Sequence, residues 1–83
     1  MYYVYIVECA DKTLYTGYTN NLDKRIKCHN DAKTGAKYTK GRGPVVLKYY
    51  EKLSTLSEAL KREIKIKKLT KKQKIELING ISN

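Results

Sequence analysis

The chain has 83 residues, which is enough for one small domain and leaves little room for a second. Eighteen lysines and arginines stand against eight acidic residues, and the formal net charge of +10 favours a polyanionic partner, with nucleic acid the first to consider. A hydrophobic content of 41% with a single proline argues against a disordered chain, and no apolar run approaches the ~20 residues of a membrane helix.

The two cysteines, Cys9 and Cys28, form neither a CxxC pair nor a disulfide framework. The first residues show neither the basic region nor the cleavage pattern of a secretion signal. The positive charge is spread along the chain and does not gather beside an apolar anchor, so a membrane partner is not expected. We therefore expect a cytoplasmic protein, and a basic surface that only keeps the protein soluble remains an alternative to nucleic-acid binding.

Residues 2–9, YYVYIVEC, are β-branched or aromatic on both alternating faces. A strand that is apolar on both faces is covered on both, so we expect it at the centre of the sheet. A second strand, TLYTGY, follows the short segment ADK.

A three-residue loop at 10–12 would place Tyr5 opposite Gly17 and direct Tyr5 and Tyr15 to the same face of the sheet. A two-residue loop would invert Tyr15, because a one-residue slip turns every side chain over. Lys12 then occupies a position where glycine is usual.

TNNLDKRIKCHN predicts a helix that Asn20 or Asn21 caps. Its helical period puts Leu22 and Ile26 on the buried stripe and places Arg25 and His29 on one edge, one turn apart. Residues 31–44 contain three glycines and the proline, which indicates a loop, and residues 45–51 read as a third strand.

Two capping boxes, TxxE at 55–58 and TxxQ at 70–73, predict a second helix to about Lys68 and a short third helix ending near Gly80. The expected order is β-β-α-β-α-α. It gives an α+β fold, a small three-stranded, mainly antiparallel sheet with helices packed on it, as a single domain over 1–83.

Glu63 stands out on the second helix because it falls inside the apolar stripe, about 20° from Leu56. The same stripe includes Ala59, Leu60, Ile64 and Ile66, whereas Lys61, Arg62, Lys65 and Glu58 are expected to face solvent. A carboxylate on a packing face must be paired, bound to metal, or open to a cleft. An ion pair with a lysine and a functional role therefore both remain open.

Two phenols, a guanidinium, an imidazole and an unusually placed carboxylate suit phosphodiester cleavage. That reaction needs a base for the nucleophile, a cation for the pentacovalent charge, and commonly a carboxylate-held Mg²⁺.

These residues resemble the GIY-YIG nuclease family, specifically its short, single-domain bacterial branch. YVY (Tyr3–Tyr5) and YTG (Tyr15–Gly17) look like its two signatures, and NLDKRIKCHN looks like its first helix. GAKYTKGRGPVVLKYYE (35–51) and EALKREIKIKKLTKKQKIELI (58–78) look like its loop, third strand and tail.

The resemblance implies a metal-dependent endonuclease whose catalytic set is Tyr5, Tyr15, Arg25, His29 and Glu63. Glu63 would hold a divalent metal, Mg²⁺ or Mn²⁺, and Arg25 would bind the scissile phosphate. His29 would orient a phenol or the phosphate. Tyr5 is our choice of base, because Gly17 leaves room for a water; this role requires a lowered pKa, which Arg25, the metal and nearby lysines could supply.

DNA is the expected substrate, cut by structure or with low sequence specificity, as in DNA repair or recombination. The residues expected to contact nucleic acid are Gly17, Lys37, Tyr38, Lys40 and Arg42, with Lys33 in the same loop. The signatures depart from the family at Tyr3, Val4 and Thr16, and Asn79 does not match the family's late asparagine. We expect no appended DNA-recognition domain, which is why low sequence specificity is expected.

The alternative is a non-catalytic nucleic-acid-binding module that retains the fold. A third interpretation, a protein–protein adaptor, needs a large exposed apolar patch, which the sequence pattern does not indicate.

Overall fold

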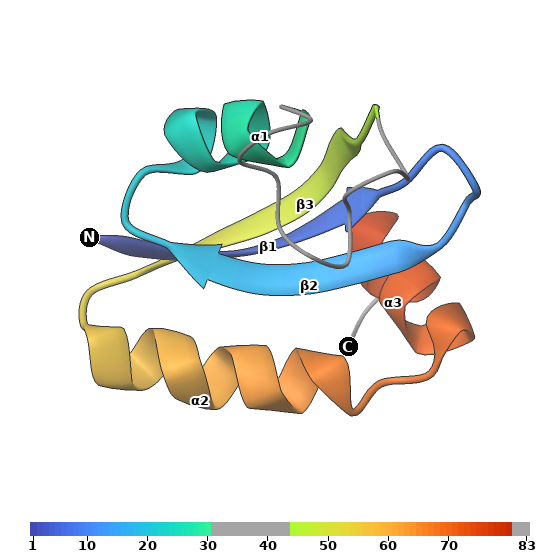
Figure 1. The fold of residues 1–83 in the computed structure, drawn as a ribbon. Coiled ribbons are helices and arrows are strands. Elements are labelled where there is room, and N and C mark those ends of the chain that lie inside the picture. The colour runs from blue at the N-terminus through green and yellow to red at the C-terminus, as the bar shows by residue number, and fades with distance from the viewer. Residues whose placement is uncertain (31–43, 81–83) are drawn as a thin grey trace.

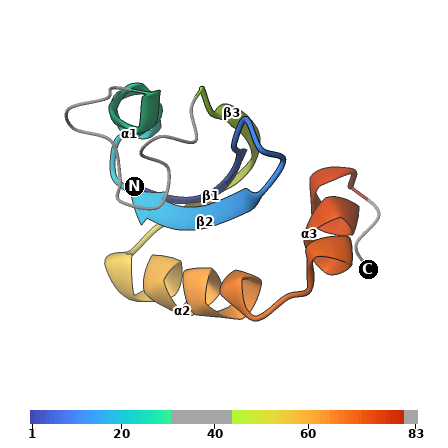
Figure 2. The ribbon, with the colours of Figure 1, turned by 45° about the vertical axis from the view of Figure 1, so that its right-hand side comes forward.

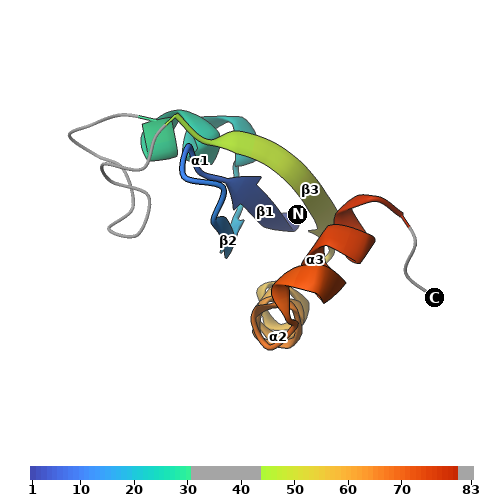
Figure 3. The ribbon, with the colours of Figure 1, turned by 90° about the vertical axis from the view of Figure 1, so that its right-hand side faces the viewer.

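The computed structural model describes residues 1–30 and 44–80 and shows a three-stranded sheet between two layers of helices (Figure 1). The elements are β1 (Tyr2–Glu8), β2 (Leu14–Thr19), α1 (Leu22–Asn30), β3 (Val46–Leu53), α2 (Leu56–Lys67) and α3 (Lys71–Ile78). Helix α1 lies on one face of the sheet, and α2 and α3 lie on the other (Figures 2 and 3). The predicted class and element order are confirmed, and both strand pairs are antiparallel.

Strand β1 lies between β2 and β3, as its two apolar faces predict. Val4 and Ile6 are fully buried in the cluster beneath α2 and α3. Tyr5 and Val7 are fully buried in a second cluster beneath α1. Within residues 1–30 and 44–80, no helix has the length and apolar character needed to cross a membrane.

The hairpin between β1 and β2 has the predicted three-residue loop at 10–12. Lys12 adopts a left-handed φ of 71°, a conformation that glycine usually occupies. The Asp11 carboxylate accepts hydrogen bonds from the Thr13 backbone N–H at 3.1 Å and from its hydroxyl at 2.6 Å. This Asx-type contact supports the turn without a glycine.

Each helix begins at a side chain that the sequence predicts as its cap. The Asn21 carboxamide oxygen accepts a hydrogen bond from the Lys24 N–H at 3.1 Å, so Asn21, and not Asn20, caps α1. The capping boxes at Thr55 and Thr70 both form. These caps need only local geometry, which explains why the sequence alone locates them.

The face of α2 that packs on the sheet differs from the predicted one. Ala59 and Ile66 are fully buried, whereas Leu56, Leu60 and Ile64 are 41%, 36% and 52% exposed. The centre of the buried face, between Ala59 and Ile66, lies about 70° around the helix axis from the predicted centre at Leu56. The predicted packing stripe is therefore wrong for these three residues, which form an apolar row on the surface.

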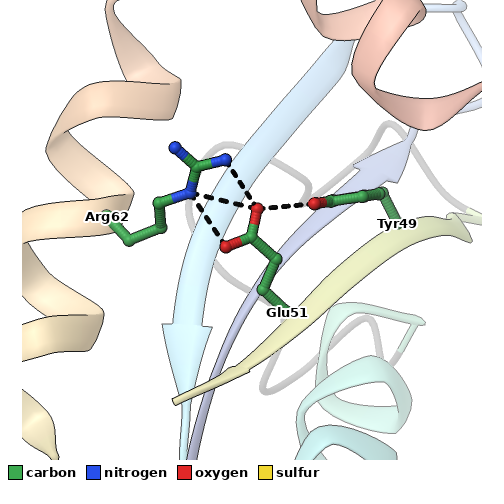
Figure 4. A network of polar contacts seen from close by, with 3 residues as sticks. All are labelled: Tyr49, Glu51 and Arg62. Carbon is green, nitrogen blue, oxygen red and sulfur yellow. Dashed lines mark hydrogen bonds and ion pairs between the residues drawn. The ribbon is translucent and has the colours of Figure 1, made fainter. Parts of the chain in front are cut away.

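In this orientation α2 forms an ion pair with β3 (Figure 4). The Glu51 carboxylate accepts every hydrogen bond of this group. Arg62 Nε donates to its two oxygens at 2.8 and 3.0 Å, and Arg62 Nη2 donates to Oε2 at 2.8 Å. The Tyr49 hydroxyl also donates to Oε2, at 2.5 Å. Burial raises the pKa of Glu51, but the hydrogen bonds from Arg62 and Tyr49 outweigh it and hold that pKa below its usual value. The prediction that Arg62 faces solvent is wrong, because apolar spacing along one helix carries no information about a partner on a strand.

Candidate active site

The antiparallel register of the hairpin brings both tyrosines to the α1 face of the sheet. Tyr5 lies opposite Gly17, which is the predicted register. Tyr5 is fully buried and Tyr15 is partly exposed. Both rings meet the imidazole of His29 edge-on, with centroid distances of 5.7 Å for Tyr5 and 5.4 Å for Tyr15.

Polar contacts converge on the phenolic oxygen of Tyr5. His29 Nε2 lies 2.8 Å from it, and Arg25 Nε donates to it at 3.3 Å. Helix α1 holds both partners in place because Leu22 and Ile26 pack against the sheet, as predicted. The Arg25 N–H occupies one lone pair of the oxygen, and the tautomer of His29 sets the direction of the other bond: in the tautomer with Nε2 unprotonated, the Tyr5 hydroxyl donates to Nε2.

His29 is neutral near pH 7. His29 is only 2% exposed. Burial is the main cause that lowers its pKa from 6.5 to about 4, and the positive charge of Arg25 is the second cause. The hydrogen bond to Tyr5 raises the pKa of Arg25, which therefore stays charged. A neutral imidazole beside a fixed cation can receive a proton from the phenol.

The space above Gly17 contains the ring of Tyr5 itself. A Cβ at residue 17 would lie 2.6 Å from Tyr5 Oη and 3.2 Å from Tyr15 Cε2. A residue without a side chain is therefore required for the rings to approach the backbone. The expectation that this space admits the attacking water is wrong, because the phenol fills it.

Burial dominates the acidity of Tyr5. Desolvation raises its pKa, and the hydrogen bond and charge of Arg25 lower it by less; Tyr15 and Glu63 raise it further. The expected lowering by Arg25 is present, but it does not outweigh burial, so the described residues alone do not give Tyr5 the lowered pKa that the role of base requires. A proton leaving Tyr5 therefore needs a nearby acceptor, and His29 is in position.

Glu63 lies on α2, which packs against β1 and β2. Its side chain is 13% exposed and pairs with Lys67, one turn along the helix, at 3.5 Å. The ion pair, one of the two alternatives for this carboxylate, is therefore present. The i,i+4 spacing in the sequence would have identified Lys67 as the partner. Although α2 and the Tyr5 cluster lie on opposite faces of the sheet, Glu63 is near enough for its charge to raise the pKa of Tyr5.

One carboxylate in the described residues, that of Glu63, is the candidate ligand for the divalent metal that the resemblance implies. No group of three His, Cys, Asp or Glu side chains gathers within residues 1–30 and 44–80. Mg²⁺ is commonly held by one or two carboxylates while water and substrate phosphate complete its octahedron. Glu63 supplies one such carboxylate, and it lies 3.5 Å from the half-exposed ammonium group of Lys67.

A groove of about 230 Å³ opens beside Arg25 and also contains Lys24. Two cations at one groove give it the charge that a phosphate requires. Its lining residues are Thr19, Asn20, Asn21, Lys24, Arg25 and Cys28. The predicted nucleic-acid contacts of the loop, Lys37, Tyr38, Lys40 and Arg42, lie outside the described residues, as does Lys33.

Two UPF0213 proteins are similar to this chain over most of its length. The UPF0213 protein CPE1444 of Clostridium perfringens is 58% identical over 82 residues, covering 99% of this chain and 87% of that protein. A UPF0213 protein of Syntrophus aciditrophicus is 57% identical over 76 residues, covering 92% of this chain and 87% of that protein.

Two solution NMR structures share the fold. The UPF0213 protein BH0048 from Bacillus halodurans has a TM-score of 0.61 at 45% identity, with 95% of this chain and 84% of that chain covered. The protein EF2693 from E. faecalis has a TM-score of 0.64 at 42% identity, with 95% of this chain and 83% of that chain covered.

The family model described as the GIY-YIG catalytic domain matches residues 1–76. This match includes every residue of the cluster around Tyr5 and also Glu63, and it confirms the resemblance. The protein therefore belongs to the GIY-YIG catalytic domain family, whose membership implies a nuclease-like function.

Proposed function

We propose that the protein is a metal-dependent endonuclease that hydrolyses phosphodiester bonds in nucleic acid, with DNA as the first substrate. The observation that carries this proposal is the convergence of Arg25 and neutral His29 on the oxygen of Tyr5. Flaps and junctions, the structures that repair and recombination produce, are the substrates that we propose first.

Arg25 binds the scissile phosphate. Its side chain is partly buried against Tyr5 and also lines the groove that contains Lys24, so one guanidinium can reach both the phenol and a bound phosphate. A fixed cation stabilises the charge that grows on the phosphoryl oxygens in the transition state. Tyr15, which reaches the surface beside His29, positions the same phosphate.

The Tyr5–His29 pair accepts the proton of the attacking water, a step that requires the bound substrate to open a path for water to Oη, because Tyr5 is fully buried. The water proton passes to Tyr5 Oη while the hydroxyl proton of Tyr5 passes to His29 Nε2, across the 2.8 Å hydrogen bond. Tyr5 is therefore never required to lose its proton in advance, which its raised pKa opposes. The water oxygen forms the new bond to phosphorus, the bond to the leaving oxygen breaks, and that oxygen takes its proton from solvent.

Glu63 is the residue that would hold the metal ion. A divalent metal held there would supply Lewis-acid polarisation of the phosphate and charge stabilisation for the leaving oxygen. Lys67, which pairs with Glu63, has to move from the carboxylate when a metal occupies it.

Two observations favour the second candidate function, a nucleic-acid-binding module that does not cut. Tyr5 is fully buried, and Glu63 already has a cationic partner in Lys67.

Cleavage of a substrate panel separates the two functions. Single-stranded, duplex, flap and four-way DNAs and matched RNAs are incubated with Mg²⁺, Mn²⁺ or EDTA. We expect metal-dependent cleavage that Glu63→Gln abolishes without changing the melting temperature. The matched control is Glu76→Gln, an exposed glutamate on α3, which should cut normally.

Cleavage that persists in EDTA would refute the role of the metal, and a Glu63→Gln variant that cuts normally would refute the role of that carboxylate. Tight binding without cleavage of any substrate, in either metal, would establish the binding module instead.

A further inference from the structure

A second groove lies on the α1 face of the sheet. Its volume is about 450 Å³, and three side chains of the sheet, Tyr3, Leu47 and Tyr50, form one wall. The other wall is formed by residues 20–23, where β2 passes into α1. Volumes of this size are typical of ligand sites.

Tyr50 presents an open aromatic surface to this groove. It lies opposite fully buried Tyr5 in the register of β1 and β3, yet it is 54% exposed. Tyr3 packs against it edge-to-face, with ring centroids 6.2 Å apart and an interplanar angle of 64°. This contact fixes the angle between the two rings, so the exposed ring of Tyr50 is held ready for a stacking partner.

The charge of the groove selects a base and not a phosphate. None of its seven lining residues is a lysine or an arginine, although the chain carries a net charge of +10. Its single charged group is the carboxylate of Asp23, which repels phosphate and accepts N–H donors. The carboxamide of Asn20 can both donate to and accept from the edge of a base.

The position of the groove continues the path of a substrate strand. Asn20 and Asn21 line both this groove and the neighbouring one, which contains Lys24 and Arg25. A strand whose phosphate lies at Arg25 can therefore place an adjacent base against Tyr50. Only an unpaired base has a free face and a free edge to offer.

We propose that this groove binds one unpaired nucleobase of the substrate, stacked on Tyr50 with its edge toward Asn20 and Asp23, so that the protein selects single-stranded or unpaired nucleic acid. This inference rests on the proposed function in one respect, namely that nucleic acid is the ligand.

Binding measured in EDTA tests the groove separately from cleavage. A labelled single-stranded DNA and the matching duplex are titrated by fluorescence anisotropy, and a strand with one 2-aminopurine reports stacking through quenching. Tyr50→Leu should weaken binding to the single strand by about fivefold to a hundredfold, the effect of removing one base–aromatic stack, and should abolish the quenching. Duplex affinity should not change.

Two variants control for the loss of a tyrosine. Tyr50→Phe keeps the ring and should bind like the wild type. Tyr18→Leu makes the same change at a tyrosine that is 41% exposed and lies opposite Val4, on the other face of the sheet, and it should have no effect.

Each outcome decides one claim. Unchanged single-strand binding by Tyr50→Leu would overturn the groove and leave the nuclease intact. Failure of every oligonucleotide to bind would overturn the groove as well. Binding to single strands that depends on Tyr50, in a protein that never cuts, would support the groove and reject the nuclease.

Discussion

The phenolic oxygen of Tyr5 reaches its two partners because residue 17 has no side chain. Tyr5 crosses the backbone of Gly17 to reach Arg25 and His29, and a methyl group there would lie 2.6 Å from Oη. The glycine of the second signature thus has a steric role that can be tested without altering any polar group.

Gly17→Ala should displace the Tyr5 ring, break both hydrogen bonds and remove cleavage activity. The free energy of unfolding should fall by about 1–3 kcal/mol, as overpacking of a buried site does. Urea unfolding and a cleavage assay measure the two effects. Adding Tyr5→Leu relieves the clash, so the double variant should lose less stability than the sum of the single variants. A Gly17→Ala protein with normal stability and activity would contradict this role.

His29 should give the protein a specific sensitivity to acid. Its pKa is 6.5 when exposed and about 4 in the fold, so below pH 6.5 the unfolded chain takes up a proton that the folded protein does not. The stabilising effect is complete above pH 6.5 and is lost as the pH falls through about 4, with a cost of up to about 3 kcal/mol.

His29→Gln isolates this effect because the chain has no other histidine. Urea unfolding of both proteins between pH 7.5 and 4 should show a steeper loss of stability for the wild type in this window. Parallel curves for the two proteins would mean that His29 titrates in the fold as it does in water. In a plot of cleavage rate against pH, the fall in rate on the acid side should likewise reflect a pKa well below 6.5.

At the scale of elements, α2 is the helix whose orientation matters most, because it carries Glu63. In the observed orientation Arg62 pairs with Glu51, Ala59 and Ile66 face the sheet, and an apolar row remains in solvent. Glu63 lies at the edge of the buried face, where its side chain is mostly covered but still 13% exposed.

Core substitutions on α2 should distinguish the observed face from the one that apolar spacing predicts. Ile66→Ala should cost about 2–5 kcal/mol of unfolding free energy, because a fully buried side chain leaves a cavity. Leu60→Ala, at a residue 36% exposed, should cost much less. Chemical denaturation of both variants measures the difference, and equal costs would place Leu60 in the core.

Local rules in the sequence predict most of the fold. The caps at Asn21, Thr55 and Thr70 and the two-sided burial of β1 depend on neighbouring residues and periodicity, so they can be predicted without a structure. The shared face of Tyr5 and Tyr15 follows from the length of one loop.

Three features of the site could not be predicted in this way. The face that α2 packs on the sheet, and the ion pair between Arg62 and Glu51, involve contacts between different elements. The raised pKa of Tyr5 depends on burial in three dimensions, and so does the filling of the space above Gly17.

At the scale of the whole molecule, the net charge of +10 predicts salt-dependent binding to nucleic acid. We propose that part of this binding comes from Lys37, Lys40 and Arg42. Replacing these three with glutamine should lower the slope of log K against log salt by about 0.9 for each phosphate of duplex DNA that the protein no longer neutralises.

A matched triple variant separates local binding from net charge. Lys61, Lys65 and Lys68 are exposed on α2 and at its C-terminal end. Replacing them with glutamine also removes three positive charges, so the net charge of the two variants is equal. Titrations at several salt concentrations should show a smaller change in the slope of log K against log salt for this control than for the loop variant. An equal change in slope for the two variants would remove the loop from the binding surface.

The cleavage rate of Tyr5→Phe tests the central claim most directly, because the substitution removes only the oxygen on which Arg25 and His29 converge. The matched control is Tyr49→Phe, which removes another hydrogen-bonded phenol oxygen on the opposite face of the sheet. In single-turnover cleavage, Tyr5→Phe should be slower by about 10²–10⁴-fold with unchanged DNA affinity, whereas Tyr49→Phe should cleave normally. A Tyr5→Phe protein that cleaves at the wild-type rate would contradict the account, and rate loss in Tyr15→Phe alone would assign the proton transfer to Tyr15.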